Sequence, residues 1–110
     1  VADCADPAAM ARFWGRAAGW NLHDQGEDFA SLRSPAGVGP YLEFLRKPDA
    51  KTVKDRLHLD VRPYPGGDHL AEAKQLRDHG AVPADVGQGD VPWVVLADPE
   101  GNEFCVLTPR

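Results

Sequence analysis

The sequence has little of what marks secreted, membrane-spanning or nucleic-acid-binding proteins. Its 110 residues include two cysteines, Cys4 and Cys105. Two are too few for a disulfide-built scaffold, so we expect free thiols in a reducing compartment. No apolar run approaches the ~20 residues that a membrane span needs, and no basic start followed by an apolar stretch marks a signal peptide. We therefore expect a cytoplasmic protein without a membrane partner.

Charge and glycine spacing exclude two further classes of protein. The chain carries 12 Lys and Arg against 17 Asp and Glu, a formal net charge of −5. Non-specific nucleic-acid binding needs cations that neutralise phosphates, so we expect no nucleic-acid partner. None of the 11 glycines has the spacing of a dinucleotide-binding or Walker loop, so no phosphate loop is predicted.

Two segments have helical periodicity with helix-ending signals. The first starts at Asp6, a good N-cap, and closes at Gly19. The second starts at Asp68 and closes at Gly80. Apolar residues recur at helical spacing within both segments and predict one buried side for each helix: Met10, Phe13, Trp14 and Ala17 in the first, Leu70, Ala73 and Leu76 in the second.

Short apolar or alternating runs between turn residues predict strands. Residues 1–4 read as the end of a strand whose start we expect to lie before Val1. A charged connector is expected over residues 47–56. The remaining strands are predicted at residues 20–22, 29–32, 41–45, 57–61, 93–96 and 104–107.

The two halves of the chain follow the same order of elements: a strand, a helix, a closing glycine and then several strands. Residues 32–37 (LRSPAG) and 96–101 (LADPEG) repeat one type I turn pattern, with Pro second and Gly fourth. This predicts a duplicated β-α-β-β-β unit, with module one at 1–46, the connector at 47–56 and module two at 57–110. Chance recurrence of Pro-Gly turns is the alternative.

Residues 98–107 (DPEGNEFCVL) resemble the closing hairpin of the vicinal oxygen chelate superfamily, which includes glyoxalases, bleomycin-resistance proteins and extradiol dioxygenases. Residues 3–7, 11–14 and 19–20 are similar to the first strand and helix of its small glyoxalase-like members, and residues 51–61 to the start of their second repeat. The resemblance implies an α+β fold of two βαβββ modules, forming an open, cup-shaped mixed β-sheet barrel with flanking helices. It also implies a small-molecule ligand in the cup and a homodimer.

Metal-dependent members of the superfamily place one ligand on the first and last strand of each module. By this resemblance, His58 and Glu43 stand at ligand positions and are the predicted metal residues. Cys105 stands where relatives carry a second Glu, and the fourth position is expected before Val1. The resemblance therefore leaves a divalent metal possible and does not favour it.

Each of these residues has a second interpretation. His58 could be a polar group that lines the cavity, and Glu43 could face solvent. Cys105 could be a nucleophile with His58 as its base, or a small buried apolar residue. Trp20, Tyr41 and Trp93 could line the cup around an aromatic ligand or pack in the core.

Two functions follow. The favoured one is a small-molecule-binding glyoxalase-like protein, metal-free or with a degenerate metal site. Its predicted ligand-binding residues are His58, Cys105, Glu43, Trp20, Tyr41 and Trp93. The alternative is a divalent-metal-dependent lyase, isomerase or dioxygenase that acts on a substrate with vicinal oxygens. The sequence leaves open whether the protein is an enzyme.

Overall fold

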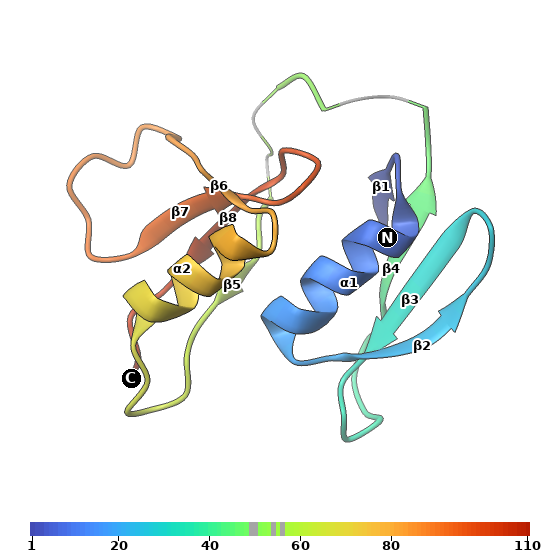
Figure 1. The fold of residues 1–110 in the computed structure, drawn as a ribbon, viewed down its shortest axis with the longest axis horizontal. Coiled ribbons are helices and arrows are strands. Elements are labelled where there is room, and N and C mark those ends of the chain that lie inside the picture. The colour runs from blue at the N-terminus through green and yellow to red at the C-terminus, as the bar shows by residue number, and fades with distance from the viewer. Residues whose placement is uncertain (49–50, 54, 56) are drawn as a thin grey trace. The chain divides into compact units, whose positions relative to one another are not determined.

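The computed structural model describes all residues except 49–50, 54 and 56. The chain divides into two compact units, Val1–Ala50 and Lys51–Arg110 (Figure 1). Each unit is built from one helix and one four-stranded mixed sheet, which confirms the predicted α+β class and the two-module fold. No helix in the described part of the chain is both long and apolar enough to cross a membrane.

The first unit has the predicted β-α-β-β-β order. Its sheet runs β1-β4-β3-β2, with β1 parallel to β4 and the other neighbours antiparallel. The antiparallel strands β2, β3 and β4 follow one another along the chain through loops at 26–28 and 34–41, whereas helix α1 connects β1 to β2 at the opposite edge of the sheet. The elements are β1 Ala2–Cys4, α1 Pro7–Ala18, β2 Asn21–Gln25, β3 Phe29–Arg33 and β4 Leu42–Arg46.

Helix α1 has the ends that its sequence predicts. The Asp6 carboxylate accepts a hydrogen bond from the Ala9 N–H at 3.1 Å, and Pro7 occupies the first turn. Gly19 closes the helix in the left-handed conformation, with φ 69°. These local signals suffice to place both ends because each uses residues within one turn.

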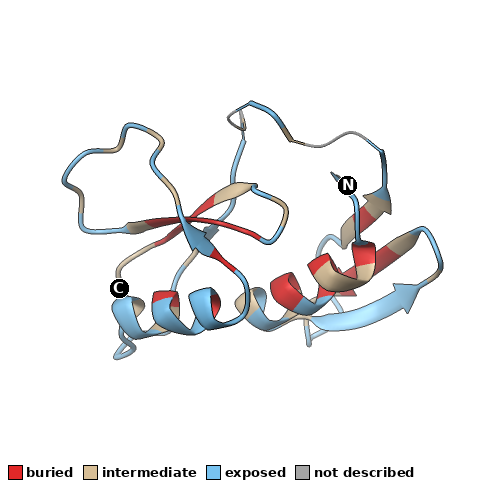
Figure 2. Ribbon diagram, turned by 45° about the horizontal axis from the view of Figure 1, so that its top comes forward, coloured by how far each residue is buried: buried red, intermediate tan, exposed pale blue. Residues whose placement is uncertain are grey.

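Helix α1 packs on one face of the first sheet. A Cβ added at Gly15 would lie 3.6 Å from the Leu32 side chain, so Leu32 of β3 faces the helix. Ala30 shares that face by strand alternation, and both are 1% exposed or less. The buried residues of the unit gather where this helix meets the sheet (Figure 2).

The second unit repeats the topology of the first. Its sheet runs β5-β8-β7-β6, with β5 parallel to β8. Phe104, Leu96 and Val106 are fully buried at its centre. The elements are β5 Asp60–Val61, α2 His69–Asp78, β6 Val82–Pro83, β7 Val94–Ala97 and β8 Glu103–Val106.

Helix α2 is capped by Asp68, as predicted, through the N–H of Leu70 at 2.9 Å. Ala73 and Leu76 are buried, but Leu70 is 60% exposed, so its predicted place on the buried side is wrong. Each step of three residues falls about 60° short of a full turn of the helix. The two steps from Leu70 to Ala73 and from Ala73 to Leu76 therefore leave Leu70 about 120° around the helix from Leu76. Leu70 therefore faces solvent in the first turn.

The strand predicted over residues 57–61 is shorter in the structure. Only Asp60 and Val61 pair with β8, and Leu57 is 88% exposed. The Leu59 carbonyl still accepts a hydrogen bond from the Cys105 N–H, but the strand pairing does not continue to His58 and Leu57, although β8 reaches Glu103. The strand predicted at 20–22 ends three residues before β2 does, and the other predicted strands lie within one residue of their observed bounds. Strand β6 was not predicted as an element.

Candidate functional site

The face of the first sheet that turns away from α1 carries polar side chains. Leu32 faces the helix, so the alternation of β3 places Ser31 and Arg33 on the other face. Glu43 pairs directly with Ser31 across β3 and β4, and directly paired residues share a face. We call this surface, with Ser31, Arg33, Tyr41, Glu43 and His23, the polar face of the first unit.

Tyr41 organises one end of the polar face. The Arg33 guanidinium carbon lies 4.5 Å from the centre of the Tyr41 ring, a cation–π contact. The His23 ring lies 4.7 Å from the same ring, centre to centre. His23 falls where the β2–β3 register shifts between Leu22 and Asp24. Such a bulge re-aims a side chain, and here it brings His23 to Tyr41.

The polar face also holds unusually buried polar groups. Ser31 is 4% exposed, and Glu43 is half-buried. The Arg33 Nε is buried and has no hydrogen-bond partner. A buried donor without an acceptor costs about 1–3 kcal/mol, more when the group is charged. The face therefore carries an unmatched donor at Arg33.

In the second unit, Cys105 lies on the face of β8 opposite the buried Phe104 and Val106. Its Sγ lies 3.9 Å from Nδ1 of His58, so these two predicted residues do come together. Burial raises the pKa of the Cys105 thiol, and the charge and hydrogen bond of Asp60 raise it further. The thiol stays protonated at neutral pH, which opposes its use as a nucleophile because the thiolate is the reactive form.

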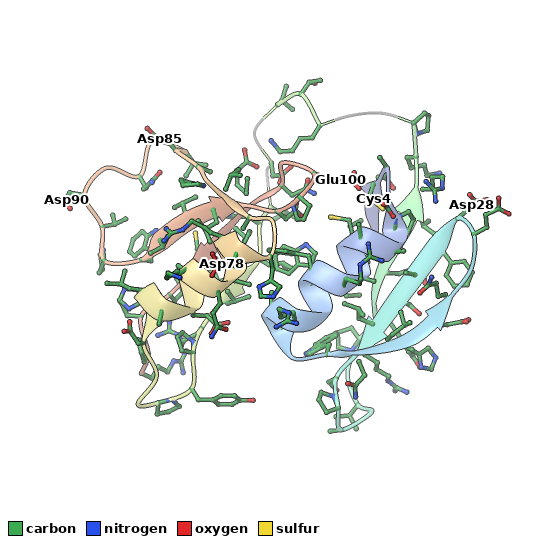
Figure 3. All side chains as sticks on the ribbon, viewed as in Figure 1. Cys4, Asp28, Asp78, Asp85, Asp90 and Glu100 are labelled. Carbon is green, nitrogen blue, oxygen red and sulfur yellow. The ribbon has the colours of Figure 1, made fainter. Side chains whose placement is uncertain are left out.

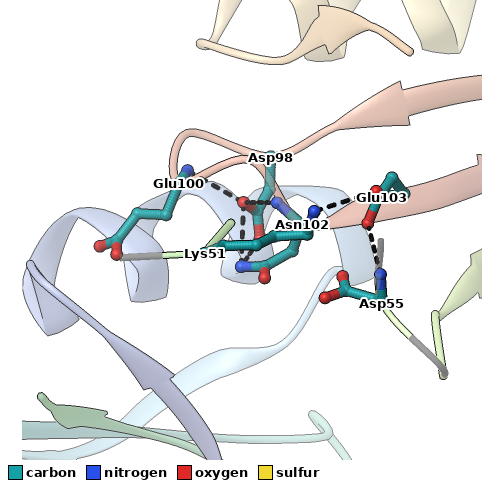
Figure 4. Close-up of polar contacts among 6 residues, drawn as sticks. All are labelled: Lys51, Asp55, Asp98, Glu100, Asn102 and Glu103. Carbon is teal, nitrogen blue, oxygen red and sulfur yellow. Dashed lines mark hydrogen bonds and ion pairs between the residues drawn. The ribbon is translucent and has the colours of Figure 1, made fainter. Parts of the chain in front are cut away.

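Glu103 shares the Cys105 face but is already engaged (Figure 4). Lys51 Nζ pairs with one carboxylate oxygen at 3.0 Å, and the Asp55 N–H donates to the other at 3.2 Å. Burial alone would raise the pKa of Glu103, but the Lys51 ammonium and the backbone N–H groups lower it to about 2. Glu103 thus ties Lys51 and Asp55 to β8 and does not replace the carboxylate that Cys105 lacks.

The turn before β8 is fixed by a second buried carboxylate. Asp98 is 3% exposed and accepts hydrogen bonds from the N–H groups of Glu100 and Asn102, each at 2.9 Å. The Asn102 amide also donates to it. This is why the Asp-Pro-Glu-Gly-Asn sequence forms so defined a turn, and why it sets where β8 starts.

The structure places the predicted aromatics differently. Tyr41 shares the polar face with Glu43. Trp20 instead lines a pocket of about 360 Å³ on the α1 side of the first sheet, together with Arg12, Arg16 and Leu22. Trp93 is 39% exposed and lies one residue before β7. Glu43 and His58 belong to different units, so their joint role as metal residues stays a prediction.

Sequence reasoning missed three residues of the polar face: Ser31, Arg33 and His23. The alternation of Phe29, Ser31 and Arg33 along β3 could have identified two of them, once Ser31 is paired with Glu43. His23 gave no such signal, because a bulge is set by strand pairing and not by local sequence.

The donors of the second unit do not fit a divalent ion. Protein metal sites usually offer three or more ligands, and a coordinating cysteine must be a thiolate. His58 and Cys105 supply two donors 3.9 Å apart, and Asp60, which lies beside the thiol, does not complete a set of three ligands with them. Within the described residues, no group of three or more His, Cys, Asp or Glu side chains could hold a metal ion.

This chain has two βαβββ units, each with a helix on one face of its sheet. This arrangement is typical of glyoxalase-like folds. Residues 1–107 match the glyoxalase-like domain family, and the chain belongs to that family within the vicinal oxygen chelate superfamily. No curated protein was found to match the chain.

Solved structures with the same fold include proteins of different kinds. One is a glyoxalase/bleomycin resistance protein/dioxygenase family enzyme from Burkholderia phytofirmans PsJN, with 16% identity over 96% of this chain and 92% of that one, TM-score 0.74. The oxidase ChaP-H2 has 21% identity over 97% and 87%, TM-score 0.66. The fosfomycin resistance protein FosX from Mesorhizobium loti has 9% identity over 94% and 83%, TM-score 0.66. At these identities the similarity establishes the fold alone.

Proposed function

We propose that this glyoxalase-like protein holds a small organic ligand without a divalent ion. The observation that carries the proposal is Cys105, a buried residue at the position where the resemblance implies a carboxylate ligand. Glu103 cannot compensate, because Lys51 and the Asp55 N–H already occupy its two oxygens. Asp60, the carboxylate beside the Cys105 thiol, does not form a metal-binding group of three with His58 and Cys105.

The ligand surface that we propose is the sheet face of each unit that carries these polar groups. In the first unit, Tyr41 offers an aromatic surface and Glu43 an acceptor. In the second unit, His58 and Cys105 offer a weak donor and acceptor pair, and Trp93 is a candidate aromatic contact. Trp20 of the first unit, on the α1 side of its sheet, remains a further candidate aromatic contact. A few placed polar groups among apolar and aromatic side chains are typical of small-molecule sites.

We also propose a homodimer of two-module chains, with residues 1–46 and 57–110 as modules and 47–56 as their connector, acting in the cytoplasm. Strand β2 supports the dimer, because it is a sheet edge and exposed along all five residues. Exposed edges invite pairing with another chain unless they are covered. Analytical ultracentrifugation tests this proposal, and a monomer at micromolar concentration would contradict it.

The alternative function, a divalent-metal-dependent lyase, isomerase or dioxygenase, has one observation in its favour. The side chains of His58 and Cys105, two positions where the resemblance implies ligands, do meet at 3.9 Å. Zinc can bind a His and Cys pair when the cysteine is a thiolate. This makes metal binding the outcome that the experiment must be able to detect.

The test is the thermal midpoint of the chain in a chelator, then with Mn²⁺, Fe²⁺, Ni²⁺ or Zn²⁺ added singly. A ligand that binds only the folded state raises the midpoint with its concentration. We expect no rise with any ion. A rise that is lost in His58→Ala and kept in His79→Ala, an exposed helix-end control, would contradict the proposal and favour the metal enzyme.

A further inference from the structure

We propose that Arg33 binds the carboxylate of the ligand, so that the small molecule held on the polar face is an organic acid. The inference rests on the proposed function and names its ligand class. It comes from one buried donor that the protein leaves unpaired, from the aromatic ring that orients it, and from the strand pairing that sets its neighbours.

The Arg33 guanidinium has no acceptor of its own. Its Nε is buried without a hydrogen-bond partner. Across the described part of the chain, the Arg33 side chain enters no ion pair, and its cation–π contact with Tyr41 is the interaction that holds it. A stacked guanidinium uses its flat face and leaves its N–H donors free in the plane. Those donors match the two oxygens of a carboxylate.

The neighbours of Arg33 favour a ligand over an internal partner. Asn21 pairs with Arg33 across β2 and β3. Two carboxylates, Asp24 on β2 and Glu43 on β4, pair with Ser31 and are therefore diagonal neighbours of Arg33. Diagonal neighbours lie about 7–8 Å apart at their Cα atoms, and neither carboxylate forms an ion pair with Arg33. The positive charge at this end of the face is therefore not neutralised by the strand beside it.

The net negative charge of the chain does not oppose this site. Several acidic residues lie exposed outside the polar face: Figure 3 labels Asp28, Asp85 and Asp90 in turns and loops and Asp78 at the end of α2. Asp28 precedes β3 at the end opposite Arg33, where it pairs with Arg46 at 3.2 Å. An oxyanion at Arg33 would thus meet a local cation.

The test uses benzoate and its neutral isostere benzamide on the full chain in chelator. We expect benzoate to bind at least tenfold more tightly than benzamide. In the ¹⁵N-labelled protein, benzoate should shift the Arg33 Nε–Hε resonance, assigned by its loss in Arg33→Lys. Arg33→Gln should weaken benzoate at least tenfold and change benzamide binding less than twofold.

Two controls separate binding from folding. Arg77→Gln, an exposed arginine on α2, should leave both affinities within twofold of the parent. Arg33→Lys keeps the charge but loses the planar fork, so it should restore less than half of the lost free energy of benzoate binding. It also serves as the folded variant if Arg33→Gln loses its native thermal transition.

The outcomes distinguish this inference from the proposed function. Equal affinities for benzoate and benzamide, unchanged in the Arg33 variants, would overturn the carboxylate inference while metal-free binding stands. The absence of any benzoate-induced shift would also overturn it, and the metal titration would still decide the proposed function independently. Benzoate binding that appears only after a divalent ion is added would overturn both.

Discussion

The buried ion pair of Lys51 and Glu103 should govern the acid stability of the second unit. Their side chains are 19% and 13% exposed, so solvent screens the pair little. Folding lowers the pKa of Glu103 from its ordinary value of 4.5 to about 2. At about 1.4 kcal/mol per pKa unit, this difference sets an upper bound of about 3 kcal/mol on the stability gained at neutral pH. Burial and the neighbouring Glu103 raise the pKa of Asp55, and this offsets part of the gain.

The sign follows from the direction of the pKa change. Because the folded pKa lies below the unfolded one, the contribution is complete above about pH 5.5 and is lost as pH falls from 4.5 towards 2. Glu103→Gln should therefore lower the free energy of unfolding at pH 7 by about 2–3 kcal/mol, since the amide can still accept one hydrogen bond. Near pH 2 the variant and parent should differ little.

Urea unfolding of the parent and variant at several pH values between 7 and 2 measures this effect. Glu27→Gln, an exposed glutamate in the turn between β2 and β3, is the matched control and should change stability by less than about 0.5 kcal/mol. Curves for Glu103→Gln and the parent that stay parallel across the acid range would refute the reasoning, because they would show that the pair does not depress the pKa.

Three further predictions concern the helix cap, the core and the thiol. Asp6→Ala removes the N-cap bond and should cost about 1 kcal/mol in urea unfolding, and an equal loss in Asp3→Ala would rule out a specific cap. Phe44→Ala empties a fully buried site in β4 and should cost about 3–5 kcal/mol; a loss under about 1 kcal/mol would show that the site is not tightly packed. In a Cys4→Ser background, Cys105 should react with a thiol reagent only slowly at pH 8 and faster as pH rises, and labelling at the rate of a free thiol would contradict its raised pKa.

The features that the sequence predicted well are local. Asp6, Gly19 and Asp68 fix helix ends through contacts within one turn, and the two Pro-Gly turns delimit strands in both units. The duplicated topology follows because each half repeats the same order of elements. The resemblance in residues 98–107 extends this to the family, because it names a turn that Asp98 holds through its own neighbours.

The features that the sequence did not predict depend on pairing between distant residues. Strand β5 has two residues although β8 extends to Glu103, and no local pattern in residues 57–61 indicates where the pairing begins. The Lys51 and Glu103 pair joins positions 52 residues apart. The polar face depends on the β3–β4 register, and without that register Glu43 could be placed on either face and Arg33 was not noticed.

The sequence names His58 as the candidate base for a Cys105 nucleophile, and the two side chains lie 3.9 Å apart. The structure adds the cause that opposes such chemistry, because burial and Asp60 keep the thiol protonated. A sequence places two reactive residues on neighbouring strands, but burial and the charges around them decide which protonation state they adopt.

The most direct test of metal-free ligand binding is the dissociation constant of benzoate measured twice by titration calorimetry, in excess chelator and again with saturating Zn²⁺ or Mn²⁺. The account predicts the same constant, within about twofold, under both conditions. Binding that is absent in chelator and appears with the ion would contradict it and would identify the protein as metal-dependent.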